Sequence, residues 1–434
     1  MTTSSGYHCS VRPVAAYIRS LDPRLPRSVW VLQLGGLLNS FGNGMVLPFL
    51  IIYLHNVRGV SLGLAGLVAA ANSAAALVTG FAAGTLADRI GPRRVLIGAL
   101  CVMAGAIALF PLIRSPWHAF TLGCALGAGS GAFWPSQSSL VNALTLRERR
   151  HSAFAVQRVT MNLGVALGGV AGGVVASTAH PRTFTLLFLL DAATFLLYVL
   201  VLSALPSPEL HPEREGGSYR QVLRDRPFVR YVALNALFMG ASMAAVVELL
   251  PPFAKNDANV SELGIGFLWF VDSLAVVLLQ LPVAKLVEGR RRMQALALMG
   301  LVWACVMLIL EAGGYWFTAT AAAAVFAGAS LLFAVGECLH GAIHVPLAAD
   351  LARPGLVGRY LALSSASWQV GWIVGPAIGG FILQHEPYAL WPLAAAANVI
   401  GAAYALRLER GLPREVLRTP TDDVHAELAP EPAG

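Results

Sequence analysis

The sequence predicts an all-α polytopic membrane protein, and three observations support this fold class. Of the 434 residues, 56% are hydrophobic and only 12% are charged, whereas soluble globular chains carry about 25% charged residues. Apolar stretches of about 20 residues, the length that crosses a bilayer as a helix, recur along the whole chain. Arginine and lysine are concentrated in alternate segments between these stretches. Soluble enzymes, nucleic-acid-binding proteins and disordered chains are therefore disfavoured.

Twelve apolar stretches separated by polar residues are the predicted membrane-spanning helices. Because lipid offers no hydrogen-bond partners to backbone groups, a helix is the expected form of each span. The first six cover residues 29–54, 62–86, 94–113, 117–143, 153–178 and 183–205. The second six cover residues 229–253, 262–286, 293–312, 316–346, 360–384 and 388–408. The chain is thus divided into two six-helix units, residues 29–205 and residues 229–408.

The positions of the basic residues predict that both chain termini are cytoplasmic. In that orientation only Arg58, Arg114, Arg182 and Lys255 lie outside, and Arg158 falls within the fifth helix. The remaining cytoplasmic segments include an N-terminal tail (1–28), a linker (206–228) with a short amphipathic turn at 218–225, and a disordered C-terminal tail (409–434). We expect a multi-pass protein of the cytoplasmic (inner) membrane that functions as a monomer.

Several kinds of chemistry have no support in the sequence. The net charge of +7 is explained by loops that face anionic lipid, so no nucleic-acid partner is expected. The five cysteines are scattered and form no CxxC pair, so neither a disulfide framework nor a resident metal is expected. The chain contains no GxxxxGK[ST] loop for ATP and no catalytic constellation. We therefore expect no enzyme activity and no cofactor.

The two halves of the chain repeat each other. With an offset of 200 residues, the second helix aligns with the eighth, and Gly66 and Asp88 match Gly266 and Glu288. With an offset of 207 residues, four glycines of the fifth helix match four of the eleventh, namely Gly164, Gly168, Gly172 and Gly173 with Gly371, Gly375, Gly379 and Gly380. Both matches join helices of the same rank, which indicates parallel repeats with a substrate site between the halves.

A short motif lies between the second and third helices. It reads Gly84-Thr-Leu-Ala-Asp88-Arg89-Ile-Gly91-Pro-Arg93-Arg94. This segment resembles the signature loop of the major facilitator superfamily, G-x-x-x-D-[RK]-x-G-[RK]-[RK], with a proline added before the basic pair. The resemblance covers about residues 29–410 and implies that superfamily's fold, two pseudo-symmetric six-helix bundles around a central cavity.

The resemblance also implies a role for this loop. In the superfamily it latches the two halves in the outward-open state, and that role falls here on Asp88, Arg89 and Arg93. Gly84 allows two helices to approach closely, and Gly91 permits a tight turn. The alternative is an ordinary cytoplasmic loop that only obeys the positive-inside rule.

Glycine recurs at regular spacing in the fifth and eleventh helices. The predicted packing and hinge residues are Gly164, Gly168, Gly375, Pro376 and Gly379. The eleventh helix resembles the GxxxGPxxGG antiporter signature, which exporters of this superfamily normally carry in the fifth helix. Such spacing favours close packing, and the proline favours bending during transport. A tight helix crossing without directional meaning is the alternative.

Ionisable residues inside membrane helices are costly, so they are candidates for function. Glu337, His340 and His344 follow each other at i, i+3 and i+7, which places them on one face of the tenth helix. A carboxylate beside imidazoles can relay protons near neutral pH. The predicted fourth helix lacks the arginine that drug–proton antiporters usually carry there, so coupling is expected elsewhere. The candidate proton-coupling residues are Glu337, Asp272, His340, His344 and Glu248.

Two other interpretations of the tenth-helix face stay open: a polar cavity wall that binds substrate, and a divalent-metal site. Asp191 of the sixth helix is expected to be structural. The candidate substrate-cavity residues are Asn39, Asn43, Trp134 and Gln137, because amides and an indole beside helix-breaking prolines suit a cavity wall. The amides alternatively only bridge neighbouring helices.

The resemblance is greatest to the twelve-span drug–proton antiporters, and it implies a secondary active transporter that works by alternating access. We expect the inward movement of protons to drive export of drugs or other amphiphilic small molecules, with protonation of Glu337 or Asp272 biasing which side is open. Proton-coupled transport of a specific metabolite, such as a sugar or organic acid, is the alternative, and export of a divalent metal is a further one. A static receptor or scaffold is disfavoured because it has little use for a rocking interface.

Overall fold

The computed structural model describes residues 25–146, 149–205, 218–353 and 355–419 of the chain. This part is built from α-helices with short 3-10 and π-helical turns, and its only β-type contact is one bridge between Arg291 and Arg418. The predicted all-α fold class is therefore confirmed.

The first half begins with a composite span made of α2 (Arg27–Val46), η1 (Leu47–Phe49), α3 (Leu50–Ile52) and η2 (Tyr53–Val57). Its other helices are α4 (Leu62–Ile90), α5 (Pro92–Leu109), α6 (Pro116–Leu144), α7 (Arg150–Val175) and α8 (Arg182–Ala204). The short helix α9 (Tyr219–Leu223) then forms at the position where the linker was expected to make an amphipathic turn.

The second half begins with α10 (Arg226–Phe238), η5 (Met239–Met243), η6 (Ala245–Leu249) and α11 (Leu250–Asn256). It continues with α12 (Glu262–Leu286), α13 (Arg292–Trp316), α14 (Ala319–Asp350), α15 (Val357–His385) and α16 (Leu390–Leu408). The first and seventh spans are interrupted where Pro48 and Pro251 stand near the start of a segment, because proline lacks an N–H and breaks the regular hydrogen bonding of a helix.

In the described part of the chain, 11 helices are long and apolar enough to cross a membrane. The twelfth predicted span is α6, which has 29 residues and contains an internal proline. At about 1.5 Å per residue it is long enough to cross a bilayer, and its glycine, serine and glutamine residues account for its lower hydropathy. Because α6 packs against both α4 and α5, it is a member of the first bundle.

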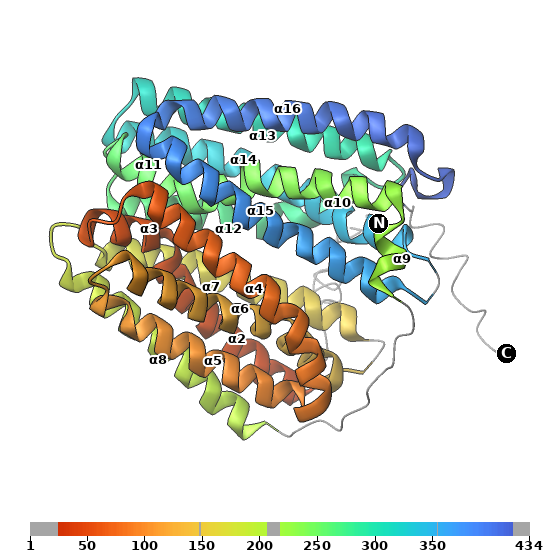
Figure 1. Cartoon of the computed structure of the whole chain (residues 1–434), viewed down its shortest axis with the longest axis horizontal. Helices are drawn as coiled ribbons and strands as arrows, with labels where there is room; N and C mark the ends of the chain where they lie inside the picture. Colours follow the sequence, from red (N-terminus) through yellow and green to blue (C-terminus); the bar gives the residue numbers. More distant parts are fainter. Residues whose placement is uncertain (1–24, 147–148, 206–217, 354, 420–434) are drawn as a thin grey trace, which may run out of the picture.

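The helices form two bundles, one for each half of the chain (Figure 1). Within the first bundle α2 packs on α7 and α8, and within the second α13 packs on α14 and α16. Two helix pairs make the main contacts between bundles, α4 with α15 and α7 with α12. These are the second, fifth, eighth and eleventh spans, so the repeat seen in the sequence becomes a symmetric pairing of helices.

The two ends of the molecule differ in charge. The turns after α4, α6, α12 and α14 share one end with the start of α10 and the end of α16, because successive spans run in opposite directions. Arg89 at the end of α4 and Arg149, Arg290 and Arg353 in these turns lie here, and we call this the arginine-rich end. The other end holds the turns after η2, α7 and α11.

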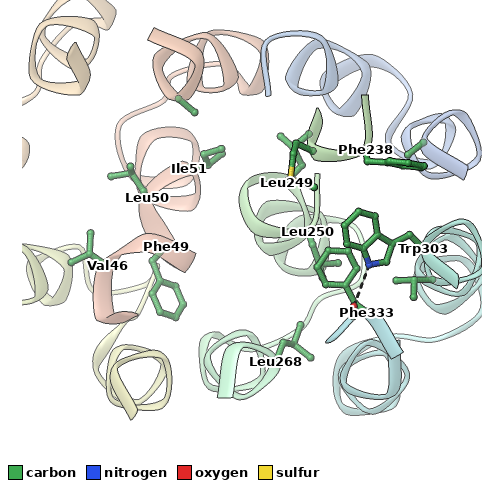
Figure 2. Close-up of a cluster of buried hydrophobic side chains, with 14 of the residues drawn as sticks. Val46, Phe49, Leu50, Ile51, Phe238, Leu249, Leu250, Leu268, Trp303 and Phe333 are labelled. Atoms are coloured by element: carbon green, nitrogen blue, oxygen red, sulfur yellow. Dashed lines mark hydrogen bonds between the residues drawn. The ribbon is translucent and has the colours of Figure 1, made fainter. Parts of the chain in front are cut away.

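Large apolar side chains fill the interior of the second bundle and the contact between bundles (Figure 2). The indole of Trp303 is fully buried, stacks on Phe333 with ring centroids 5.1 Å apart, and donates a hydrogen bond to the Phe333 carbonyl at 3.2 Å. Phe49 and Leu50 of the first half belong to the same core cluster as Leu250 of the second, and their segments pack together. The bundles therefore share one hydrophobic core at the end opposite the arginine-rich end.

The segment after α16 is ordered as far as Thr419, which corrects the prediction of a disordered tail from residue 409. It forms η8 (Glu409–Gly411) and η9 (Arg414–Val416) and then pairs with the turn between α12 and α13. Buried Glu409 forms an ion pair with Arg291 at 2.5 Å, and Leu417 accepts a hydrogen bond from the Arg292 N–H at 2.8 Å. The predicted tails at 1–24 and 420–434 lie outside the described residues.

Candidate functional site

The two halves are joined at the end opposite the arginine-rich end. Asn56 of the first half donates its side-chain N–H to the Asn256 Oδ1 of the second half at 2.7 Å. The backbone N–H and hydroxyl of Thr178 donate to the Glu262 Oε1 at 3.0 and 2.8 Å. Gln384 accepts a hydrogen bond from the Gly63 N–H at 3.0 Å. These contacts close this end of the space between the bundles.

Glycines allow the close approach of helices at this end. A Cβ on Gly380 would lie 2.8 Å from the Leu62 carbonyl oxygen and 3.1 Å from the Gly66 Cα. A Cβ on Gly173 would lie 2.7 Å from the Glu262 carbonyl oxygen. Any larger residue at either position would push the halves apart.

The predicted packing residues divide into two groups in the structure. Gly164 and Gly168 pack on α2 within the first half, and Gly375 packs on Gly240 within the second. Gly379 lies against Leu249 and Leu390, also within its own half. Pro376 differs from the others because its carbonyl faces Gly66 across the interface. Most of the predicted hinge set therefore holds each bundle together, whereas Gly169, Gly173 and Gly380 join the bundles.

A cavity of about 530 Å³ lies between the halves toward the arginine-rich end. Its walls come from the second half of α4, the middle of α6 and the first half of α15, and α9 closes part of its mouth. Phe81, Trp134, Tyr219 and Gln369 are among its lining residues, and no lining residue carries a charge. The volume falls in the range of about 300–1,000 Å³ typical of small-molecule sites.

Of the four predicted cavity residues, Trp134 lines this cavity. The Gln137 amide donates to the Tyr198 hydroxyl at 3.1 Å, and Gln137 also borders a separate void of about 10 Å³. Asn39 is buried, with its Oδ1 unpaired among the described residues, and Asn43 is partly buried. Gln137 therefore bridges α6 and α8, which is the alternative role expected for these amides.

The signature loop lies at the mouth of the same cavity. Gly84 lines it, and a Cβ at that position would meet nothing within 4 Å. Gly91 has a φ of +93°, so it makes the tight turn between α4 and α5. Arg89 is exposed, and Arg93 donates to the Ser203 carbonyl at 2.6 Å, within its own half. The side chain of Asp88 lies outside the described part of the structure.

The two histidines of α14 belong to a buried hydrogen-bond network inside the second half. His340 contacts Asn235 with its Nε2 2.7 Å from Oδ1, and the Asn235 amide donates to Ser367 at 2.7 Å. His344 is held through Nδ1 by Tyr231 at 2.7 Å and through Nε2 by Ser364 at 2.9 Å. The network ties α14 to α10 and α15.

Donor and acceptor rules settle part of this network. Because the Asn235 Nδ2 donates to Ser367, its Oδ1 is the acceptor for His340, so His340 carries a proton on Nε2. The Tyr231 hydroxyl donates to the His344 carbonyl at 3.1 Å, which is compatible with a proton on the Nδ1 of His344. Both nitrogens of His344 are thus occupied, and the ring links α14 to α10 and α15.

The carboxylates of the second half lie apart from that network. Asp272 of α12 and Glu337 of α14 interact through their charges, and Asp272 has an oxygen that is buried without a hydrogen-bond partner among the described residues. The charge of Arg158, on α7 of the first half, acts on Glu337 and on His340. A Cβ built on Gly341 would lie 3.3 Å from the Arg158 Nη2, so this guanidinium reaches across to α14.

Glu248 and Asp191 are also buried inside spans, apart from Asp272 and Glu337. Glu248 is buried in the η6 turn. Asp191 is buried and accepts a hydrogen bond from Thr194 at 3.4 Å, facing Gly42 of the first span. Among the described residues, no group of three histidine, cysteine, aspartate or glutamate side chains is arranged to hold a metal ion.

Sequence reasoning assigned no role to Arg158, Asn235, Ser364 and Tyr219. Arg158 had a visible signal, because it is an arginine placed inside a predicted span. Ser364 and Asn235 had none, since their importance comes from the histidines that the fold brings to them. Tyr219 lies in the linker, and only the tertiary structure shows that it borders the cavity.

The fold and the cavity between two six-helix halves define a membrane transporter. The family model of the Major Facilitator Superfamily matches residues 32–336 and 249–431, so the chain belongs to the major facilitator superfamily. A crystal structure of the peptide transporter POT in complex with sulfate shares this fold, with a TM-score of 0.75, 16% identity, and coverage of 91% of this chain and 96% of that one.

Curated relatives are similar over most of their length. The MFS-type transporter YttB of Bacillus subtilis (strain 168) is 26% identical over 372 residues, which is 83% of this chain and 89% of that protein. The multidrug resistance protein MdtH of Cronobacter sakazakii is 27% identical over 362 residues, which is 81% of this chain and 84% of that protein.

Proposed function

We propose that this transporter is a proton-coupled exporter of drugs or other amphiphilic small molecules that works by alternating access. One observation carries the proposal. The uncharged cavity between α4, α6 and α15 lies apart from the charged group of Arg158, Asp272 and Glu337. The first arrangement suits an amphiphilic ligand, and the second suits a titrating switch. The similarity to a relative named as a multidrug resistance protein supports the same substrate class.

The charges of Arg158 and Glu337 link protonation to the conformation of the transporter. Arg158 belongs to the first half and Glu337 to the second, and both lie inside the spans, where attraction between charges is stronger than in water. The ionised carboxylate draws the two halves together near the arginine-rich end. Protonation of Glu337 removes that attraction, so the proton changes the balance between the states open at one end and at the other.

The alternatives that the sequence leaves open have less support. A carrier for one strongly polar or charged metabolite has less support, because the polar groups of the cavity lining are neutral hydroxyls and one amide. His340 and His344 are buried in the second half and are committed to neighbouring helices. A divalent-metal exporter needs a cluster of ligands, and the described residues contain none.

Transport into proteoliposomes tests the proposal. We expect an imposed proton gradient to drive transport of a fluorescent amphiphilic dye, rhodamine 6G, in the direction opposite to the proton flow. An imposed sodium gradient should not drive transport of the dye. Glu337→Gln and Asp272→Asn should each reduce the proton-driven rate by about tenfold, because the switch loses its charge. Asp191→Asn is the matched control, since that carboxylate faces the first span away from the cavity. Unchanged proton-driven transport in both the Glu337 and the Asp272 variants would contradict the proposal.

A further inference from the structure

The linker helix α9 takes part in the wall of the central cavity. Its residue Tyr219 borders the cavity, although it belongs to neither six-helix bundle. The helix is anchored by Val222, which is fully buried, and by packing against α10 and α15. Ser218 caps its start by accepting a hydrogen bond from the Arg220 N–H at 3.2 Å. Tyr219 is therefore held in place at the cavity mouth.

Tyr219 touches both halves of the transporter. Its ring meets the ring of Phe81 of α4 edge to face, with centroids 6.2 Å apart and planes at 89°. On its other side, the Arg359 guanidinium carbon of α15 lies 5.7 Å from the Tyr219 ring centroid. The linker thus places an aromatic ring between a first-half ring and a second-half cation.

Three aromatic rings in the cavity keep a large part of their surface exposed. The exposed fractions are 48% for Phe81, 47% for Trp134 and 42% for Tyr219. The polar groups in the lining are neutral, mainly serine hydroxyls and the amide of Gln369. Exposed ring faces gain from stacking or edge-to-face contact with another ring, and they attract diffuse positive charge. A strongly hydrated metal ion finds no opposite charge in this lining.

We propose that Tyr219, Phe81 and Trp134 form a binding site for flat aromatic amphiphiles. Tyr219 of the linker is a specificity-determining residue of this site, because its ring is the part of the wall that both halves contact. The proposal deepens the proposed function and rests on it only in identifying the ligand as a transported compound.

Equilibrium binding to the purified full-length protein in lipid nanodiscs tests this site. The probes are rhodamine 6G, which is aromatic, and dodecyltrimethylammonium, an amphiphilic cation without a ring. Tyr219→Leu should raise the Kd for rhodamine 6G by about fivefold, the loss expected for one aromatic contact. The Kd for dodecyltrimethylammonium should change by less than twofold, and Tyr219→Phe should bind both probes as the wild type does.

Tyr404→Leu is the control variant, because Tyr404 is a similarly exposed tyrosine on α16, away from the cavity. Unchanged rhodamine 6G binding in Tyr219→Leu would overturn the site, and so would equal loss of both probes or failure of the wild type to bind either one. Binding that depends on Tyr219 without proton-driven transport in liposomes would keep the site and remove the proposed function.

Discussion

The interface between α4 and α15 can be compared with the interface between α7 and α12, because the internal repeat relates one to the other. Both join the second span of one half to the fifth span of the other. Both also use glycine for close approach: a Cβ on Gly66 would lie 3.1 Å from the Gly380 Cα, and a Cβ on Gly173 would lie 3.3 Å from the Gly266 Cα. At the level of the backbone the two interfaces are equivalent.

Their side chains differ in charge. At the closed end, α4 and α15 are joined by a neutral hydrogen bond between Gly63 and Gln384. The α7–α12 interface uses the carboxylate of Glu262, which accepts two hydrogen bonds from Thr178 and forms an ion pair with Lys255 at 2.9 Å. Toward the arginine-rich end, the uncharged cavity lies along α4 and α15, whereas Arg158 projects from α7.

This difference teaches which positions of a duplicated fold stay alike and which do not. Small residues at the helix crossings are required in both halves, since only they permit the close packing on which closure depends. Side chains beside the crossings are free to diverge. Here neutral and aromatic groups lie beside one interface and charged groups lie beside the other, which is the separation that the proposed function requires.

We expect the largest effect on transport from a disulfide that locks the two halves together at the closed end. Asn56 and Asn256 are related by the 200-residue offset and contact each other across the halves. In a background without the native cysteines, Asn56→Cys with Asn256→Cys should form a disulfide. This disulfide should reduce the rate of dye transport by at least about tenfold, because the closed end can no longer open. Reduction should restore transport, and the single Asn56→Cys variant should not respond to oxidation. Full transport with the disulfide formed would show that this end need not open.

A smaller effect separates the charged interface from the neutral one. The rate of disulfide formation in the same cysteine pair reports how often the end is closed. Glu262→Ala should lower this rate by about tenfold and Gln384→Ala by about twofold, because hydrogen bonds to a charged group contribute about twice as much as neutral ones. Glu262→Gln should fall between them, since it keeps an acceptor and loses the ion pair with Lys255. Equal effects of Glu262→Ala and Gln384→Ala would remove the distinction between the interfaces.

Apolar patterning and charge placement predicted most of the fold. The spans follow from runs of apolar residues, and even α6 was found although Gly127, Gly129 and Gly131 dilute its hydropathy. The tail after residue 408 was mispredicted because its composition is that of a disordered segment. Its order comes from Glu409 and Leu417, which pair with a turn more than one hundred residues earlier.

The site was predictable only in part. Trp134 was identified from its type and from its place beside a helix proline, and the structure places it in the cavity wall. The grouping of Glu337 with His340 and His344 followed from helical spacing, which places residues on a face without showing what that face meets. In the structure Asn235 forms a hydrogen bond with His340, and Ser364 forms one with His344. The charge of Arg158, from the other half, acts on the Glu337 carboxylate. Contacts between distant segments decide these partners, and periodicity does not contain that information.

The smallest expected effect concerns Asp257, in the turn between α11 and α12 at the closed end. Burial raises the pKa of Asp257 to about 6, while the charge of His55, from the first half, lowers it in part. The folded protein therefore holds this proton at a higher pH than an unfolded chain does, whose aspartate pKa is about 3.9. Between about pH 4 and 6 the folded state binds more protons, so stability increases as the pH falls through that window.

Thermal unfolding in detergent at a series of pH values measures this contribution. The Tm of the wild type minus that of Asp257→Asn should rise as the pH falls from about 7 to 4 and level off below, because the asparagine variant has no proton to gain. His55→Gln is the informative second variant, since it removes the first-half charge that opposes the shift. When both proteins carry His55→Gln, the difference in Tm between them should begin to rise at a higher pH. A difference in Tm that stays constant across the whole window would show that closure of this end does not bury the Asp257 carboxylate.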